Sequence, residues 1–319
     1  MNQDWKEFLL KQSAEIEDGP DVDAEAFITD LSRFSVLEIS GEDAESFLQA
    51  QLSSDVSSLK PGNWQRSAWC NIKGRVIATF LIYRSDSHFL LLVEHEQCES
   101  ISKRLQMFVL RAKVSITDQS GILVRLGLSA SGQIVDEVES DKLVVMPVKG
   151  KPQRAIVICP TEAAITLWQS MSSVLPHASP DAWALKDIRA GLPWVGVEGS
   201  EEFLPQSLNL DLLGGLSFDK GCYPGQEIVA RMHFRGKLKQ RLFVARVSSS
   251  KEISSGDKIY SSSAQQHVGQ IVNRCKNSAD QYEILIALDL AAVDENTLHL
   301  LEENGPELEL LELPYSLDS

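Results

Sequence analysis

One stretch of the chain combines residue types that support thiol chemistry, namely Asp219-Lys-Gly-Cys-Tyr-Pro-Gly-Gln-Glu227. Pro224-Gly225 predicts a type II turn, because proline presets φ at the first corner and glycine accepts a positive φ at the second. Apolar residues then recur at helical spacing, so we expect a short helix that begins near Gln226. The sequence therefore predicts a cysteine in a tight loop ahead of a helix.

Cys222 is the candidate catalytic residue of this loop, together with Lys220. The N-terminus of a helix presents unpaired N–H groups and the positive end of the helix dipole. Lys220 adds a full positive charge two positions before the cysteine, and both effects favour the thiolate, which is the reactive form. The residues alone leave two interpretations open. One is a reactive nucleophile, and the other is a small buried thiol, the commoner state of a free cysteine.

The whole chain has the composition of a soluble globular protein, with 319 residues, 43% hydrophobic and 24% charged. Its length predicts about two or three domains. No apolar run approaches the roughly 18 residues that span a bilayer, so we expect no membrane partner. The acidic N-terminus resembles neither a secretory signal nor an Arg-rich transit peptide, and we therefore expect a cytoplasmic protein.

The chain has five cysteines, which are scattered along the sequence and form no C-x-x-C pair. An odd, sparse set favours a reducing compartment and argues against a disulfide framework. It also argues against a four-cysteine zinc or iron–sulfur site, whose ligands normally cluster, so we predict no metal site. The five are Cys70, Cys98, Cys159, Cys222 and Cys275.

The formal charge of −15 opposes broad binding to nucleic acid, where neutralisation of phosphates dominates affinity. We therefore expect no strong direct nucleic-acid binding. A short basic strip after the cysteine loop is the exception, and it has two open interpretations: a solvated face, or an anion site beside Cys222. Its members are Arg231, Arg235, Lys237, Lys239 and Arg241.

The elements that must position these residues follow from the apolar pattern. Strand-like and helical runs mix irregularly up to residue 236, with a hairpin signal at Lys73-Gly-Arg75, which predicts α+β layers. Beyond it, short β-rich runs predict a small barrel or sandwich. The expected organisation is an acidic, partly helical extension adding little to the core (1–30), a first α+β domain (31–120), a second with the cysteine loop (121–236) and a C-terminal β-barrel (237–319).

Lys-Gly-Cys-Tyr-x-Gly-Gln-Glu, at residues 220–227, resembles the signature of the YgfZ family, folate-binding proteins related to the glycine-cleavage aminomethyltransferase. The resemblance runs from about residue 30 to the end. It rests also on 203–211, 214–218, Val229-Ala-Arg231, Phe234-Arg-Gly236, Asn296-Thr-Leu-His299 and Leu313-Pro-Tyr-Ser-Leu317.

The resemblance implies an α+β, aminomethyltransferase-like fold. In that fold two interleaved α+β domains and a C-terminal β-barrel form a ring around a folate channel, so linear domain boundaries are approximate. The implied cofactor is tetrahydrofolate or another folate derivative.

The resemblance also implies cofactor-binding residues. Trp183 is similar in position to a folate-binding tryptophan, and Phe34 lies where the family often has a second one. Lys73 and Arg75 look like a family element near the channel. Arg231 and Arg235, from the basic strip, would meet the glutamate carboxylates of folate. From the residues alone, a core aromatic on a helix face is the favoured interpretation of Trp183, and Lys73 and Arg75 are equally solvated charges of a turn.

The implied function is that of a folate-binding accessory protein with Cys222 as the reactive thiol. It would support iron–sulfur cluster assembly or repair, and thereby tRNA methylthiolation. Its partners would be iron–sulfur enzymes such as the radical tRNA-methylthiolating enzyme, and we expect a monomer. The alternative is a tetrahydrofolate-dependent one-carbon transferase. Arg189 argues against it, because aminomethyltransferases usually have glutamate there and a cation cannot accept hydrogen bonds from a pterin. Whether the chain is an enzyme stays open.

Overall fold

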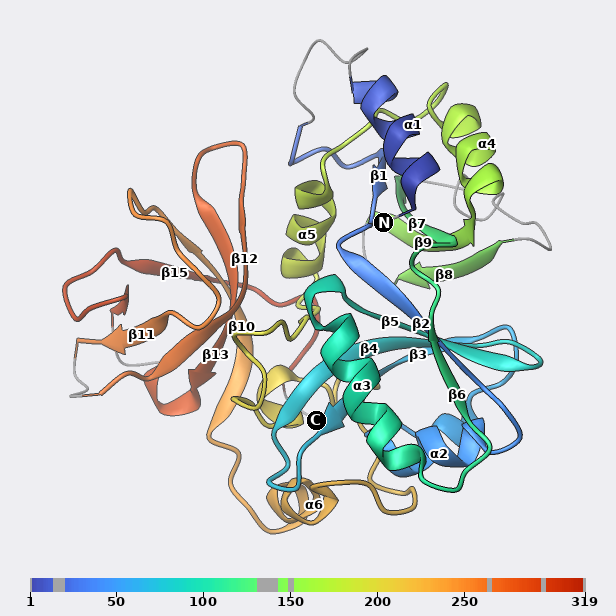
Figure 1. Ribbon diagram of the computed structural model, residues 1–319. Helices are drawn as coiled ribbons and strands as arrows, with labels where there is room; N and C mark the ends of the chain where they lie inside the picture. The colour runs from blue at the N-terminus through green and yellow to red at the C-terminus, as the bar shows by residue number, and fades with distance from the viewer. Residues whose placement is uncertain are drawn as a thin grey trace.

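A computed structural model describes residues 2–13, 21–130, 143–148, 152–262, 266–293 and 297–317. Three antiparallel sheets of four, five and six strands organise the chain, with helices around the first two (Figure 1). The α+β class and the C-terminal barrel are therefore confirmed. None of the described helices is long and apolar enough to cross a bilayer.

The five-stranded sheet has the order β3-β4-β5-β2-β6. Its strands alternate side chains between two faces, and the outer face packs against two amphipathic helices. On the inner face, Phe34, Leu81 and Leu92 meet residues of the four-stranded sheet. The elements are β2 (Phe34–Ser40), α2 (Ala44–Gln51), β3 (Trp64–Cys70), β4 (Val76–Arg84), β5 (His88–Glu94), α3 (Cys98–Val109) and β6 (Ser115–Asp118), with short 3-10 turns at Val56–Ser58 and His95–Gln97.

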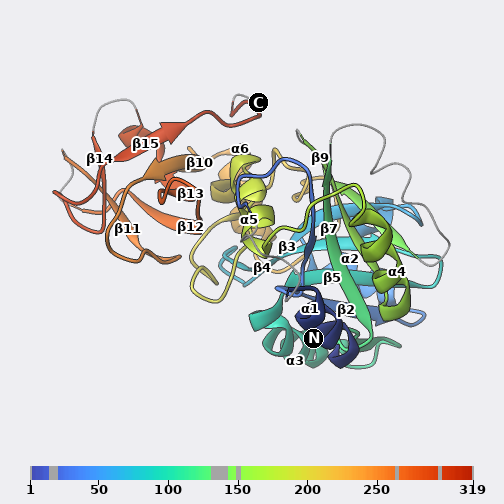
Figure 2. The same cartoon turned by 90° about the horizontal axis from the view of Figure 1, so that it is seen from above.

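The four-stranded sheet has the order β1-β7-β9-β8. Two helices cover its outer face, and its first strand precedes the five-stranded sheet in the chain, so the two sheets interleave along the sequence (Figures 1 and 2). The domain boundaries stay a prediction. The elements are α1 (Gln3–Ser13), β1 (Phe27–Asp30), β7 (Leu123–Ala130), β8 (Val144–Val148), β9 (Gln153–Pro160) and α4 (Thr161–Met171).

The expectation that residues 1–30 add little to the core is wrong. Trp5 is 1% exposed, donates its indole N–H to Asp30 at 2.8 Å, and packs edge-on against Trp168. Phe27 and Ile28 are fully buried in β1. The signal was present in α1, where Trp5, Phe8 and Leu9 recur at helical spacing, but β1 has only four residues and shows no clear period.

The six strands of the barrel have the order β14-β11-β12-β13-β10-β15, and a single bridge between His299 and Glu307 nearly closes it. We did not predict β15, the last of these strands. Asn296, part of the family resemblance, lies outside the described residues. The elements are β10 (Gln240–Val247), β11 (Lys258–Ser261), β12 (Gly269–Lys276), β13 (Tyr282–Asp289), β14 (Leu298–Leu300) and β15 (Leu308–Leu311), with a 3-10 turn at Leu290–Ala292.

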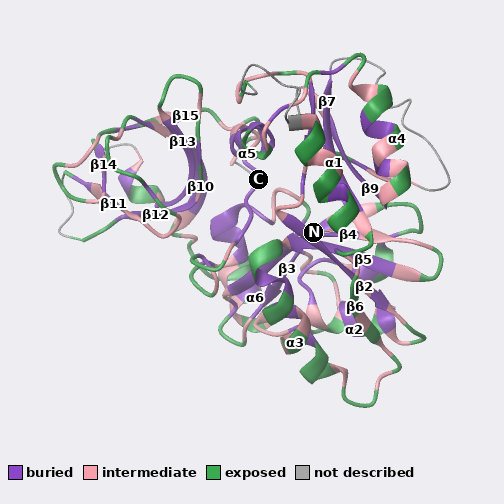
Figure 3. Ribbon diagram, turned by 45° about the horizontal axis from the view of Figure 1, so that its top comes forward, coloured by how far each residue is buried: buried purple, intermediate pink, exposed green. Residues whose placement is uncertain are grey.

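Helix α5 (Pro180–Arg189) stands between the barrel and the two sheets (Figure 2). Seven consecutive residues, 182–188, are buried, so the helix is covered on every side (Figure 3). It begins at Pro180, whose fixed φ suits the first turn of a helix, and is followed by Gly191 at φ +64°. The Tyr315 hydroxyl donates to the Gly191 carbonyl at 2.9 Å, which brings the C-terminal segment back to this central helix.

Asp23 joins the segment before β1 to the barrel. Its carboxylate accepts hydrogen bonds from the backbone N–H and hydroxyl of Ser278 and from Arg189. Burial alone would raise the pKa of Asp23, but the Ser278 and Arg189 hydrogen bonds outweigh it and lower the pKa to about 2.

We expect Asp23→Asn to flatten the acid limb of stability. A carboxyl whose pKa is lowered on folding stabilises the protein above its unfolded value, and this contribution disappears as pH falls from 3.8 towards about 2. The effect should be below about 1 kcal/mol, because Asp23 is partly exposed and solvent screens its interactions. Urea unfolding of both proteins between pH 6 and pH 2.5, in steps of about one pH unit, measures the difference in their free energies of unfolding. Parallel pH profiles would contradict it.

Candidate functional site

The loop that carries Cys222 has the predicted turn. Gly225 adopts φ +78° and ψ 1°, and the Gln226 N–H donates to the Tyr223 carbonyl at 3.2 Å. These are the dihedral angles and the hydrogen bond of a type II turn. Helix α6 (Gln226–Phe234) begins at the predicted residue. The local sequence thus determines this part of the site.

The β3–β4 hairpin packs directly against that turn. Gly74, at φ +71°, lies so close to Gly225 that a Cβ on Gly225 would come within 2.4 Å of the Asn71 carbonyl oxygen. The structure therefore brings two predicted residues, Lys73 and Arg75, to the cysteine loop. Arg75 donates to the Glu202 carbonyl at 2.6 Å, while Lys73 is exposed.

We expect Gly225→Ala to lower the free energy of unfolding by about 2–5 kcal/mol, the sum of a positive φ and of overpacking against backbone. Gly214→Ala is the matched control. Gly214 has φ +72° but nothing within 4 Å of its Cβ position, so it should lose only about 1–2 kcal/mol. Urea unfolding compares the two. Equal losses would show that the hairpin yields to the added methyl group.

Lys220 anchors the loop to the end of α2. Its ammonium donates to the carbonyls of Gln49 and Leu52 at 2.6 Å and of Ser54 at 2.8 Å. Carbonyls at a helix C-terminus carry partial negative charge, which favours a cation there. Burial lowers the pKa of Lys220 to about 8. Lys220 therefore holds the loop in place, and within the described residues it has no hydrogen bond to the Cys222 thiol.

Cys222 is exposed, so the alternative of a small buried thiol is wrong for this residue. The other four cysteines are buried. Burial raises the pKa of Cys98 to about 11 and those of Cys70, Cys159 and Cys275 to about 12. Of the five thiols, Cys222 is the one that a reagent or partner reaches without opening the fold.

The basic strip is shorter than the sequence indicated. Arg231 and Arg235 are exposed on and just after α6, as are Lys237 and Lys239, and none of the four has an ion pair within the described residues. Arg241 differs, because its guanidinium binds both carboxylate oxygens of Asp211 at 2.7 and 2.9 Å. Four cations beside the cysteine loop thus remain available to an anion.

Phe34 and Trp183 lie together in the core between the two sheets, and both are completely buried. The Phe34 ring is 4.3 Å from that of Trp194, and the Arg154 guanidinium lies 4.6 Å over Trp183. The structure places this pair in a different core cluster from Tyr223 of the cysteine loop. Their folate-binding role stays a prediction.

Three buried arginines were not predicted from the sequence, and one of them is Arg125 in β7. Arg154, in β9, donates to Asp187 at 2.8 Å, and Asp187 also accepts from the Trp194 indole at 3.0 Å. Arg66, in β3, is the third. A charged residue inside an otherwise apolar strand was the available signal, because such residues are rarely buried without a partner.

Arg189, where a transferase would be expected to have glutamate, is held by acids. It binds Glu283 through two hydrogen bonds of 2.7 and 2.8 Å and Asp23 at 2.5 Å. The hydrogen bonds to Glu283 raise the pKa of Arg189 further. Its side chain therefore links α5 to the barrel.

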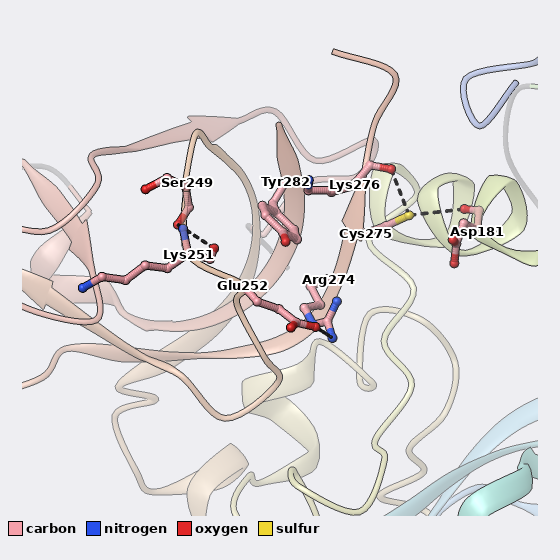
Figure 4. A pocket seen from close by; sticks show the side chains of 9 residues that line it. Asp181, Ser249, Lys251, Glu252, Arg274, Cys275, Lys276 and Tyr282 are labelled. Atoms are coloured by element: carbon pink, nitrogen blue, oxygen red, sulfur yellow. Dashed lines mark hydrogen bonds and ion pairs between the residues drawn. The ribbon is translucent and has the colours of Figure 1, made fainter. Parts of the chain in front are cut away.

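A polar cavity of about 510 Å³ lies where α5 meets the barrel (Figure 4). Arg274 faces Glu252 at 3.7 Å, and the Cys275 thiol donates to the Asp181 carbonyl at 3.4 Å. Lys276 pairs with Asp280 at 3.4 Å. Because its charges are matched locally, this cavity shows no preference for a charged ligand, and we do not assign the functional site to it.

Known proteins resemble this chain in both sequence and fold. A family model, the GCVT N-terminal domain, matches residues 10–142. The glycine cleavage system aminomethyltransferase T from Bartonella henselae superposes with a TM-score of 0.73 over 92% of this chain and 87% of its own, at 15% identity. This likeness shows the aminomethyltransferase-like fold.

Curated relatives establish the family. The tRNA-modifying protein YgfZ of Colwellia psychrerythraea is 35% identical over 69% of this chain and 71% of its own length. That of Vibrio atlanticus is 26% identical over 92% of this chain and 94% of its own. With the Lys-Gly-Cys-Tyr-Pro-Gly-Gln-Glu loop built as described, the chain belongs to the YgfZ family.

Proposed function

We propose that this protein is a folate-binding accessory factor in tRNA modification, in which Cys222 acts as the reactive thiol. The observation that carries the proposal is the exposed Cys222 in a loop that Lys220 fixes to three carbonyls. A thiol that is fixed in place and accessible can transiently attack a group of a partner or bind to it as a ligand. The names of the relatives supply the tRNA-modification role.

The residues present fit a folate on two counts. Folate carries carboxylates and a flat ring system, and the exposed cations Arg231, Arg235 and Lys73 near the loop suit its carboxylates. In the core, Trp183 has an indole N–H without a partner, which suits an acceptor on a ring edge. Trp183 and Phe34 would hold the ring only if the core between the sheets opens, because both are fully buried.

The finer role we propose is support of iron–sulfur cluster assembly or repair in a partner such as the radical tRNA-methylthiolating enzyme. Arg189, tied to Glu283 and Asp23, leaves a cation where transferase chemistry would need a carboxylate, which favours the helper over the one-carbon transferase. Direct tRNA binding is expected to be weak, because four unpaired cations stand against a net charge of −15.

Two measurements test the proposal. Tetrahydrofolate is titrated against intrinsic tryptophan fluorescence, and methylthiolated tRNA is quantified in bacteria that lack their own relative of this protein. We expect saturable binding in both the unmodified protein and Cys222→Ser, but rescue of methylthiolation only by the unmodified protein. Cys98→Ala, at a buried thiol, is the control that should rescue. Full rescue by Cys222→Ser would refute the thiol role, and absence of binding would refute the folate role.

A further inference from the structure

Helix α6 has one face that no other part of the described chain covers. Val229 is fully buried under the helix, and Figure 1 shows α6 at the lower edge of the molecule, beneath the β3–β4 hairpin. The opposite face repeats at helical spacing and consists of Glu227, Arg231, Phe234 and Arg235, all of them exposed. The helix therefore presents an unpartnered face that is both apolar and charged.

An aromatic cluster forms the apolar part of this face. The Phe218 ring stacks on the imidazole of His233 with the ring centroids 3.8 Å apart, and it lies edge-on to Phe234 at 6.0 Å. Phe234 is itself 67% exposed. Because Phe218 precedes the cysteine loop and His233 and Phe234 end α6, the cluster joins the two sides of the candidate site. It offers aromatic faces on which another apolar side chain can pack.

The tip of the β3–β4 hairpin extends the face at the first turn of α6. A Cβ at Gly74 would lie 3.3 Å from the Ile228 side chain and 3.2 Å from that of Val229, so the tip and the helix are in contact. Beside Gly74, Ile72 is 83% exposed and Lys73 is exposed. Exposed apolar groups that are rimmed by charged residues mark interaction surfaces, whereas single scattered ones do not.

The charge of this face is opposite to that of the protein. Lys73, Arg231, Arg235, Lys237 and Lys239 are exposed, and none of them has an ion pair within the described residues. The chain as a whole carries a formal charge of −15. A positive surface in such a chain attracts a negatively charged partner to one place and orients it there.

We propose that this face docks an acidic segment of a partner protein, in which an aliphatic or aromatic side chain stands among carboxylates. The carboxylates would bind the guanidinium groups, and the apolar side chain would pack on the aromatic cluster. A nucleic acid fits less well, because its phosphates extend beyond the face into the field of an acidic chain, and Ile72 offers no ring for a base. The face, called the α6 surface below, consists of Ile72, Lys73, Arg231, Phe234 and Arg235.

Docking on the α6 surface would bring the partner to the exposed thiol, because α6 begins four residues after Cys222. The inference goes beyond the proposed function, since the surface can hold a partner whatever reaction Cys222 performs. Arg231 and Arg235 are also the cations that would meet the carboxylates of folate. The two ligands would exclude each other there, so competition between them decides which one these cations serve.

The probe is a fluorescein-labelled peptide in which glutamates flank a phenylalanine and a leucine, and its binding to the full chain is followed by fluorescence anisotropy. Three comparison probes separate the contributions. The first has serine in place of both apolar residues, the second has glutamine in place of the glutamates, and the third is an oligouridylate of the same charge. Analytical ultracentrifugation of the protein alone tests whether a second copy of the chain occupies the surface.

Two variants of the α6 surface each have a matched control. Arg231→Glu combined with Arg235→Glu is compared with Lys251→Glu combined with Lys276→Glu, which changes the net charge equally at exposed cations of the barrel. Phe234→Ser is compared with Ile122→Ser, which replaces a residue of similar exposure, 63%, before β7. All these side chains are exposed, so the fold should be kept, and thermal unfolding verifies it.

We expect saturable binding of the peptide, which each α6-surface variant weakens by about tenfold or more, whereas the controls stay within about twofold. The three comparison probes should also bind about tenfold more weakly. The proposal is overturned if the peptide does not bind, if any comparison probe binds as tightly, if the variants bind like their controls, or if the chain dimerises through this surface. Displacement of the peptide by tetrahydrofolate would assign the cations to folate and overturn it as well. Absence of tetrahydrofolate binding would refute the folate role alone.

Discussion

Iodoacetamide is expected to modify Cys222 in the native protein about a hundredfold or more faster than any of the other four cysteines. Cys222 is exposed, whereas the others are at most 5% exposed. A thiol whose pKa is raised to about 11 or 12 is thiolate in only about one molecule in ten thousand, or fewer, at pH 7. Burial and protonation act in the same direction, so the difference in rate should be large.

Peptide mapping by mass spectrometry over a time course gives the five rates. Cys222→Ser should remove the rapid phase and leave the slow modification unchanged, because the serine replaces an exposed atom. Fast modification of Cys98 or Cys275 in a protein that is still folded by circular dichroism would mean that the core opens readily. In that case accessibility would not distinguish Cys222 from the other four cysteines.

Trp183→Ala should lower the free energy of unfolding by about 3–5 kcal/mol, the usual cost of deleting a fully buried aromatic ring. The ring packs against the backbone of β7 so closely that a Cβ at Gly127 would lie 2.6 Å from it. It also carries the Arg154 guanidinium on its face. The cavity left behind lies between two sheets and cannot collapse easily.

Trp183→Phe is the matched control. It keeps an aromatic face for Arg154 and deletes an indole N–H that has no partner, so we expect a loss of only about 1–2 kcal/mol. Urea unfolding separates the two variants. A loss below about 1 kcal/mol for Trp183→Ala would show that this core is loosely packed and open to a ligand. Folate affinity is therefore better compared in Trp183→Phe, whose fold is less disturbed.

The sequence by itself determined the local parts of this protein. The Pro224-Gly225 turn, the start of α6 at Gln226 and the hairpin at Lys73-Gly-Arg75 are as predicted. Each depends on the backbone preference of proline or glycine, or on apolar spacing within one helix, and these act over a few residues. The C-terminal barrel could also be predicted from the sequence, because short strands separated by turn residues recur evenly from residue 240.

The tertiary structure alone decided what these elements do together. Lys220 lies in the cysteine loop, yet its ammonium binds carbonyls about 170 residues away in the sequence, at the end of α2. Trp5 and Arg154 drew no prediction from the sequence, yet Trp5 is part of the core and Arg154 is buried against Asp187. Partners and burial depend on which distant segments meet, and the pattern of one segment does not encode its partner. The candidate role of Cys222 could therefore be predicted from the sequence, whereas its exposure and the anchoring of its loop by Lys220 required the fold.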